Sequence, residues 1–144
     1  MKLYKVVRKL KNGDLVSALI EKETGMRETY RHHGATQAVP IGFLFTDLDD
    51  AKKWALEWVG HYCEYSYEIW ECEVKKTSPI KWLIHHVRVC KSLKEKLIRL
   101  ICGDKDSLAF DREGAYVITA HPDFKGIIGH NIKLTTKLYS EMVY

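Results

Sequence analysis

The stretch Ile41-Gly-Phe-Leu-Phe-Thr-Asp-Leu-Asp-Asp-Ala-Lys-Lys-Trp-Ala-Leu-Glu-Trp-Val59 decides the fold. Its first five residues form a short, aromatic-rich apolar run between Pro40 and Thr46, which is typical of a buried strand. Thr46 or Asp47 can then cap a helix, because a side-chain oxygen there accepts a backbone N–H that the first turn leaves unpaired. The stretch therefore predicts a strand that leads into a capped helix.

The helix that follows this strand has one apolar face. Apolar residues recur at the spacing of helical turns, which is typical of a helix packed against a sheet: Leu48, Ala51, Ala55, Trp58 and Val59. Gly60 is expected to end the helix, because glycine readily adopts the backbone conformation of a C-terminal cap. The whole apolar face, Trp58 included, is expected to pack into the core.

A second strand is expected over Tyr67-Glu-Ile-Trp-Glu-Cys-Glu-Val74, because its side chains alternate between two faces. Trp70, Cys72 and Val74 share one face and are expected to face the helix. The glutamates of this strand could form a catalytic pair of carboxylates, but solvated charges on a half-exposed strand explain them better. Residues 41–74 thus predict a strand-helix-strand unit.

Further strands are expected on both sides of this unit. Residues 3–10 and 15–20 predict a hairpin, because Asn12-Gly13 between them is the strongest short hairpin signal. Three more strands are expected: an exposed one at 27–31, a short one at 115–119 and a last one at 132–139.

Two further helices are expected in the second half of the chain. Ser78-Pro79 is a helix start signal, and apolar residues follow at helical spacing, although residues 85–89 are also compatible with a strand. Ser92-Leu-Lys-Glu95 is a capping box, and the helix that it begins is expected to end at Gly103. The fold class predicted for residues 1–144 is a single α+β domain with a mainly antiparallel sheet, the embedded strand-helix-strand unit and these two helices.

Composition is that of an ordinary globular protein. Of the 144 residues, 46% are hydrophobic and 29% are charged, and a chain of this length can bury a core. No apolar run approaches the length of a membrane span, and the first residues lack the apolar block of a signal peptide. We therefore expect a cytoplasmic protein with no membrane partner, of undetermined oligomeric state.

Cysteine and histidine form no familiar metal motif. The four cysteines contain no Cys-x-x-Cys pair, so a zinc site is weakly supported and free thiols in a reducing compartment are expected. The pairs His32-His33 and His85-His86 each point apart on a helix or a strand, so neither suits one metal ion. No metal and no cofactor are expected.

Positive charge is concentrated in one part of the chain. The net charge is +4, but residues 75–99 contain eight basic residues and one acidic residue, which leaves −3 for the rest. With one tryptophan, the basic residues form the candidate binding surface: Lys75, Lys76, Lys81, Trp82, Arg88, Lys91, Lys94, Lys96 and Arg99. Such a surface can attract phosphate and stack a base, but solvation alone also explains a charged helix face. No glycine-rich phosphate loop or RNA-recognition motif accompanies it.

Four stretches of the expected core carry a resemblance. They are Tyr4-Lys-Val-Val7, Pro40-Ile-Gly-Phe-Leu-Phe-Thr-Asp-Leu-Asp-Asp-Ala-Lys-Lys-Trp54, Tyr67-Glu-Ile-Trp-Glu-Cys-Glu-Val74 and Gly129-His-Asn-Ile-Lys-Leu-Thr-Thr-Lys-Leu-Tyr139. Together they resemble a family of small, uncharacterised phage and mobile-element proteins. The resemblance implies roles directed at the host, including the inhibition of bacterial defence systems in the manner of an anti-CRISPR protein.

A fainter resemblance concerns Phe43-Leu-Phe-Thr-Asp-Leu-Asp-Asp-Ala-Lys-Lys-Trp-Ala55 followed by Tyr67-Glu-Ile-Trp-Glu71. These stretches are similar to the middle of ADP-ribosyltransferase-like folds, which implies NAD- or nucleotide-dependent transfer. The resemblance also implies an Arg or His on the first strand and a late acidic or polar residue near the nicotinamide. Tyr4-Lys-Val-Val7 contains no His, Arg8 lies past the expected position, and Asn131-Ile-Lys-Leu-Thr-Thr136 contains no acid, so the resemblance also allows a degenerate, non-catalytic version of the fold.

The favoured hypothesis is therefore a non-enzymatic binding protein of mobile-element type. Its basic surface would occlude a host protein or capture an anionic nucleotide or nucleic acid. The alternative is a divergent transferase, whose site would unite Tyr4, Trp54 and one glutamate of the second strand. A third hypothesis is an assembly subunit with an apolar self-interface through Trp82 and Val89.

Overall fold

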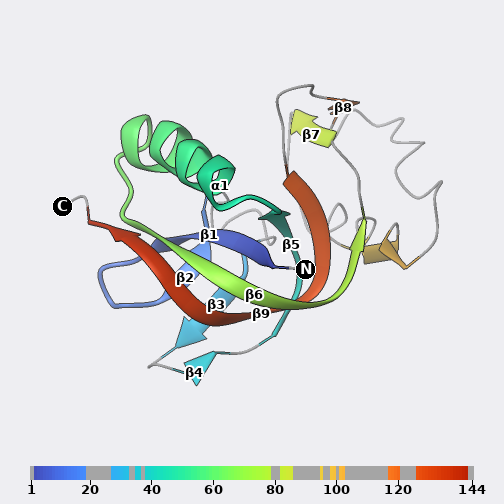
Figure 1. Ribbon diagram of the computed structural model, residues 1–144, viewed down its shortest axis with the longest axis horizontal. Helices are drawn as coiled ribbons and strands as arrows, with labels where there is room; N and C mark the ends of the chain where they lie inside the picture. The colour runs from blue at the N-terminus through green and yellow to red at the C-terminus, as the bar shows by residue number, and fades with distance from the viewer. Residues whose placement is uncertain are drawn as a thin grey trace.

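The computed structural model shows an α+β protein with a mainly antiparallel sheet and a helical run over residues 48–61 (Figure 1). It describes residues 2–18, 27–32, 35–36, 38–78, 82–85, 95, 98–99, 101–102, 117–120 and 126–142. In chain order the elements are β1 (Leu3–Lys9), β2 (Leu15–Ser17), β3 (Thr29–His32), β4 (Ala35–Thr36), β5 (Val39–Phe45), α1 (Leu48–Trp54), the π-helix η2 (Ala55–His61), β6 (Tyr67–Ser78), β7 (Trp82–His85), β8 (Val117–Ala120) and β9 (Gly126–Glu141).

Four of the strands close into a ring. β1 pairs with β6, β6 with β9 and β9 with β5, and β5 returns to β1 through the pair Tyr4 and Phe45. β2, β3 and β4 extend the sheet from β1, while β7 and β8 form a separate two-stranded sheet. In Figure 1 the two longest strands, β6 and β9, bend together around the ring. The main sheet is therefore a small closed barrel with a three-stranded extension.

A cluster of buried side chains fills the inside of the ring: Leu3, Val7, Leu15, Tyr30, Val39, Leu44, Trp70, Cys72, Ile132 and Leu134. Lys5 is buried beside them, and its Nζ donates a hydrogen bond to the Phe43 carbonyl oxygen at 2.8 Å. The Tyr30 ring centroid lies 5.6 Å from the same Nζ. The prediction of an exposed strand at 27–31 is thus wrong for Tyr30, because β3 pairs with β2 and carries this ring over the core.

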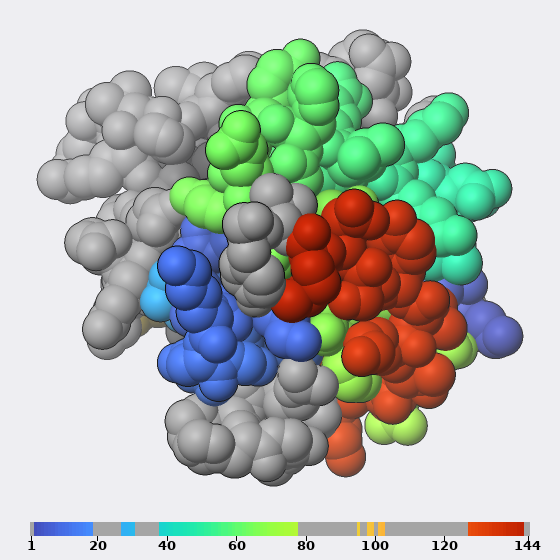
Figure 2. Space-filling model, turned by 90° about the vertical axis from the view of Figure 1, so that its left-hand side faces the viewer, coloured from blue at the N-terminus to red at the C-terminus, as the bar shows by residue number. Residues whose placement is uncertain are grey.

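A second buried cluster joins the helical run to the outer face of the barrel: Val6, Ala18, Phe45, Ala51, Ala55, Val59, Tyr67 and Ile69. Figure 2 shows the green helical run lying above the red strand β9 and the blue hairpin β1–β2. β6 faces the helix with Tyr67 and Ile69, so the prediction that Trp70, Cys72 and Val74 face it is wrong. Closure of the ring buries both faces of this part of β6, and alternation alone does not say which face the helix covers.

The start of the helical run follows its sequence signal. Asp47 is the cap, and its Oδ1 accepts hydrogen bonds from the N–H groups of Asp49 at 2.7 Å and Asp50 at 3.1 Å. This confirms one of the two expected caps. The run continues past Gly60 to His61, so the predicted end is wrong by one residue.

The second half of the helical run departs from the predicted apolar face at Trp58. This side chain is 49% exposed, whereas Ala55 and Val59 are buried. The segment is a π-helix, in which the Tyr62 N–H donates to the Glu57 carbonyl oxygen five residues earlier. The wider turn changes which side chains face the sheet, so the predicted burial of Trp58 is wrong.

The first hairpin and the last strands confirm their sequence signals. Gly13 has a φ of +92° in the turn between β1 and β2, a conformation that glycine adopts without steric cost. The strand expected at 115–119 is β8, and the strand expected at 132–139 is the central part of the longer β9.

The region after β6 confirms one expected helix in part and contradicts the other. Leu83 and Ile84, expected on a helix, lie in β7, where they pair with Thr119 and Ile118 of β8. Of residues 85–89, which are also compatible with a strand, His85 ends β7, and residues 86–89 lie outside the described part of the chain. The described residues at 95, 98–99 and 101 are helical, and the Cys102 N–H donates to the carbonyl oxygen four residues earlier at 3.1 Å.

Candidate anion-binding surface

The structure places only part of the predicted basic surface. Lys75 and Lys76 are exposed near the end of β6, and Trp82 lies in β7. Arg99 is exposed among the helical residues at 95, 98–99 and 101. The other five predicted residues lie outside the described part of the chain: Lys81, Arg88, Lys91, Lys94 and Lys96. The candidate site is therefore built from the two β6 lysines and from what surrounds them.

The lysines lie where β6 and β9 bend together. At this bend Asn131 has a φ of +54°, in the left-handed region that asparagine tolerates better than most residues. The ladder pairs Val39 with Ile132 and Ile41 with His130, so Asn131 lies opposite Pro40. Because proline has no N–H to donate, the strand can turn at this position without losing a ladder hydrogen bond from β5.

One contact and one glycine fit the bend to the rest of the barrel. His130 Nδ1 lies 2.6 Å from the Pro40 carbonyl oxygen, and a carbonyl can only accept, so Nδ1 carries the proton. Gly129 permits the strands to approach closely, because a Cβ at this position would overlap Leu44 Cδ1 and would lie 2.9 Å from Val74 Cγ1. The bend is therefore a fixed part of the barrel.

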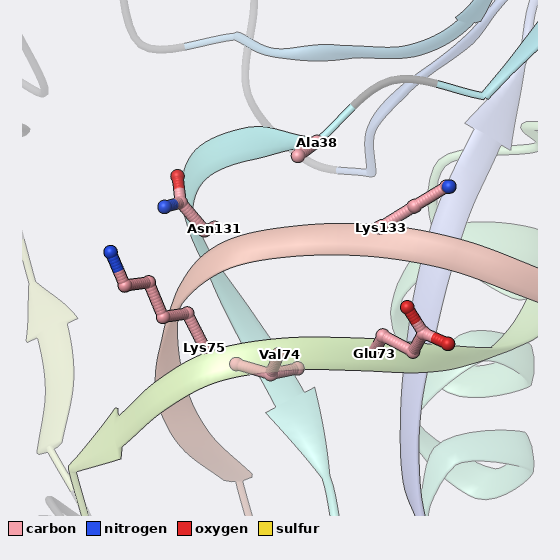
Figure 3. A pocket seen from close by; sticks show the side chains of 6 residues that line it. All are labelled: Ala38, Glu73, Val74, Lys75, Asn131 and Lys133. Carbon is pink, nitrogen blue, oxygen red and sulfur yellow. The ribbon is translucent and has the colours of Figure 1, made fainter.

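A shallow, open depression of about 320 Å³ lies on the outside of this bend, and Figure 3 shows its lining. Its lining residues come from the start of β5, the end of β6 and the middle of β9: Ala38, Glu73, Val74, Lys75, Asn131 and Lys133. In Figure 3 the side chain of Lys75 rises toward Asn131, while Lys133 stands farther along β9. Lysine side chains from two neighbouring strands thus line one hollow, and their ammonium groups point toward opposite ends of it in this view.

The charge around the depression is mixed but mainly positive. Lys75 and Lys133 are exposed there, and Glu73, which pairs with Lys133 across the ladder, is the carboxylate beside them. Two ammonium groups and one carboxylate leave a net positive field, which attracts anions from solution. The amide of Asn131 adds hydrogen-bonding capacity. This arrangement can hold a phosphate or carboxylate group, and it contains no paired nucleophile and base.

Asn131 and Lys133 were not among the residues predicted for the site. They come from a strand that begins 48 residues after β6 ends. The expected strand at 132–139 indicated the secondary structure of Lys133, but it did not include Asn131 and did not indicate the strand with which either residue pairs. A register that connects residues so far apart in the chain is set by the barrel, and no local pattern reports it.

The residues of the transferase hypothesis lie partly together, because Tyr4, Trp54 and Glu71 lie on the helix side of the barrel, whereas Glu68 lies opposite Val7 on the other face. Tyr4 and Trp54 pack beside the helix-side cluster, and Glu71 pairs with Tyr4 across the ladder. Glu68 is fully buried and accepts a hydrogen bond from Trp70 Nε1 at 2.9 Å. The ammonium groups nearest its carboxylate are those of Lys9 at 3.5 Å and Lys137 at 3.9 Å.

Burial strongly shifts the pKa of titratable side chains inside the barrel, and it raises that of Tyr30 well above its usual value. Burial lowers the pKa of Lys5 to about 8 and raises the pKa of the Cys72 thiol to about 12. The thiols of Cys63, Cys72 and Cys102 are free, and no group of three or more His, Cys, Asp or Glu residues in the described part of the chain could hold a metal ion. Lys5 and Cys72 are both buried, with 7% and 8% of their surfaces exposed.

Comparison with protein-family models, with curated proteins and with solved structures gives no match in any of the three. Among the described residues, no helix has the length and apolar character that a membrane span requires.

Proposed function

We propose that this chain is a non-enzymatic binding protein of phage or mobile-element type that captures an anionic partner at the β6–β9 bend. The bend surface comprises Lys75, Lys76, Asn131 and Lys133. The partner is a nucleotide or nucleic acid, bound through phosphate, or an acidic face of a host protein. Binding occludes that partner, and inhibition of a host defence system is the biological effect expected of such occlusion.

The observation that supports this proposal is the meeting of lysines from two strands around one depression. Lys75 and Lys133 are far apart in the chain, yet both border the hollow at the bend. Lys76 follows Lys75 on β6 and points to the opposite face of the strand, and the end of β6 lies within residues 75–99, where the chain's excess positive charge is concentrated. Lys75 and Lys76 are thus the first residues of this longer basic stretch.

The test reverses the charge of the bend surface without altering the core. Lys75→Glu with Lys133→Glu changes two exposed side chains, and Lys11→Glu with Lys53→Glu makes the same change in net charge elsewhere on the surface. A fluorescently labelled dT12 oligonucleotide and an acidic Glu-rich peptide are titrated against the wild type and both variants at several salt concentrations. Fluorescence anisotropy reports the affinity.

We expect one of the two probes to bind the wild type with an affinity that falls as salt rises, because phosphate contacts release counterions. The bend variant should bind about tenfold or more weakly, as loss of two charge contacts implies, and the control variant within about twofold of the wild type. Binding of dT12 identifies the nucleic-acid version, and binding of the peptide alone identifies the acidic-protein version. Equal effects of the two variants would show that the bend surface is not the site.

A further inference from the structure

A group of large apolar side chains projects from the helical run into solvent. Leu56 is 59% exposed, Trp58 49% and Tyr62 67%. The rings of Trp58 and Tyr62 lie against each other with centroids 5.7 Å apart, and His61 meets the Tyr62 ring edge-on at 5.2 Å. We call Leu56, Trp58 and Tyr62 the aromatic ridge.

The ridge is not needed to attach the helix to the barrel. Ala51, Ala55 and Val59 already fill the face toward the sheet. Keeping a tryptophan, a tyrosine and a leucine exposed to water forgoes the burial free energy that each could contribute. Exposed aromatic side chains that contact each other, as Trp58 and Tyr62 do, mark interaction sites, and tryptophan and tyrosine are the residues that most often dominate protein interfaces.

The charges beside the ridge select the class of partner. Glu57 is exposed between Leu56 and Trp58, and Glu64 is exposed two residues after Tyr62. These carboxylates, within and beside the ridge, repel a phosphate backbone, and they attract ammonium or guanidinium groups. Lys52 and Lys53 are the exposed cations that precede them on the helical run, and Lys52 Nζ lies over the Tyr139 ring. The ridge therefore favours a cationic protein segment over nucleic acid.

Aromatic rings elsewhere in this chain already hold cations. The guanidinium carbon of Arg8 lies 4.3 Å from the centroid of the Tyr65 ring, and Lys52 Nζ lies 5.5 Å from that of Tyr139. The exposed faces of Trp58 and Tyr62 offer the same interaction to an outside cation, and tryptophan is the strongest of the aromatic acceptors.

We propose that the aromatic ridge docks a basic, partly aliphatic segment of a partner protein. An Arg or Lys side chain of that segment stacks on Trp58 or Tyr62 and pairs with Glu57 or Glu64, while an aliphatic side chain covers Leu56. The ridge attracts cationic groups and the bend surface attracts anionic groups, so the two sites bind different ligands. The inference does not depend on the function proposed for the bend.

Three probes distinguish the possible partners: a 12-residue peptide of alternating Arg and Leu, a peptide with Glu in place of Arg, and dT12. The wild-type chain carries ¹⁵N-labelled tryptophan, and the Trp58 indole signal, assigned by its loss in Trp58→Ala, reports binding at the ridge. We expect the Arg-Leu peptide to shift this signal and the other two probes to leave it unchanged.

The variants separate a specific ridge from general stickiness. Trp58→Ala should weaken binding of the Arg-Leu peptide about tenfold, as loss of a central aromatic contact does. Glu57→Gln with Glu64→Gln should weaken binding of the same peptide about threefold. Leu138→Ala, which removes an exposed apolar side chain of β9, is the matched control and should leave affinity unchanged. Lys75→Glu with Lys133→Glu should also leave it unchanged, which separates the ridge from the bend surface.

Several outcomes would overturn the proposal. A Trp58→Ala protein that binds the Arg-Leu peptide as tightly as the wild type would place the contact elsewhere. Equal binding of the Glu-Leu peptide would remove the role of the two glutamates, and a dT12-induced shift of the Trp58 signal would assign the ridge to nucleic acid. Circular dichroism of each variant shows that the fold is retained.

Discussion

Asn131 holds a left-handed backbone conformation in the middle of β9, with a φ of +54°. A β-branched side chain is strained in this region, whereas glycine is not. We expect Asn131→Val to lower the free energy of unfolding by about 1–3 kcal/mol and Asn131→Gly to leave it nearly unchanged. Urea denaturation followed by tryptophan fluorescence measures both. Equal stability of the two variants would mean that the left-handed conformation does not hold in solution.

Lys5 makes the stability of the barrel depend on pH. Burial lowers its pKa from 10.5 to about 8, so between these values the unfolded chain keeps a proton that the folded chain has lost. Stability therefore rises with pH in that window. Compared with Lys5→Met, the wild type should gain about 1 kcal/mol between pH 8 and pH 9, since one pKa unit corresponds to 1.4 kcal/mol.

The pH comparison stops at pH 9 because of Cys72. Burial raises the pKa of its thiol from 9.0 to about 12, so above pH 9 ionisation of the unfolded chain begins to lower stability. Denaturant titrations at pH 7, 8 and 9 measure the difference between the wild type and Lys5→Met. Lys11→Met, at the exposed hairpin turn, is the control. A constant difference from pH 7 to pH 9 would show that the Lys5 ammonium is hydrated in the folded state.

At the scale of elements, the helical run depends on its cap. Asp47 accepts two N–H groups that the first turn cannot satisfy internally. Asp47→Ala should lower the free energy of unfolding by about 1 kcal/mol, and Asp47→Ser should restore most of it. Asp49→Ala, also in the first turn, is the control and should cost a few tenths of a kcal/mol through the helix dipole. Equal losses for Asp47→Ala and Asp49→Ala would argue against the cap.

The elements that the sequence predicts well are those whose signals are local. Asn12-Gly13 marks the hairpin and Asp47 marks the helix start, and each acts through atoms within three residues of itself. Local sequence does not determine which face of β6 the helix covers, because ring closure buries both faces of this strand. Trp58 likewise fits an α-helical face in the sequence, and only the π turn of η2 carries it outward.

At the scale of the whole molecule, the ring should be the most stable part. The first half of β6 has β1 on one side and β9 on the other, whereas β7 and β8 have only each other among the described strands. We expect the amides of Ile69 and Trp70 to exchange with solvent only on global unfolding, and those of β7 and β8 to exchange much faster. Hydrogen exchange measured by NMR tests this order, and β7 amides as slow as those of β6 would contradict it.

The candidate site illustrates the same limit on prediction from sequence. Lys75 and Lys76 were identified from the density of positive charge along the chain, which needs no structure. Asn131 and Lys133 reach the same surface through pairing between strands separated by 48 residues. The choice of β6 as the partner of β9 follows from packing inside the barrel, where Trp70 and Cys72 meet Leu134, and this packing leaves no periodic mark in the sequence.

Closure of the ring also bears on synthesis of the protein. β9 supplies the strand between β5 and β6, and it lies farther along the chain than any other described strand. A nascent chain that has emerged from the ribosome only as far as β8 therefore exposes unpaired backbone along both β5 and β6. Such strand edges can pair with neighbouring chains and promote aggregation, so a polypeptide truncated before Gly126 depends on chaperones until it is degraded.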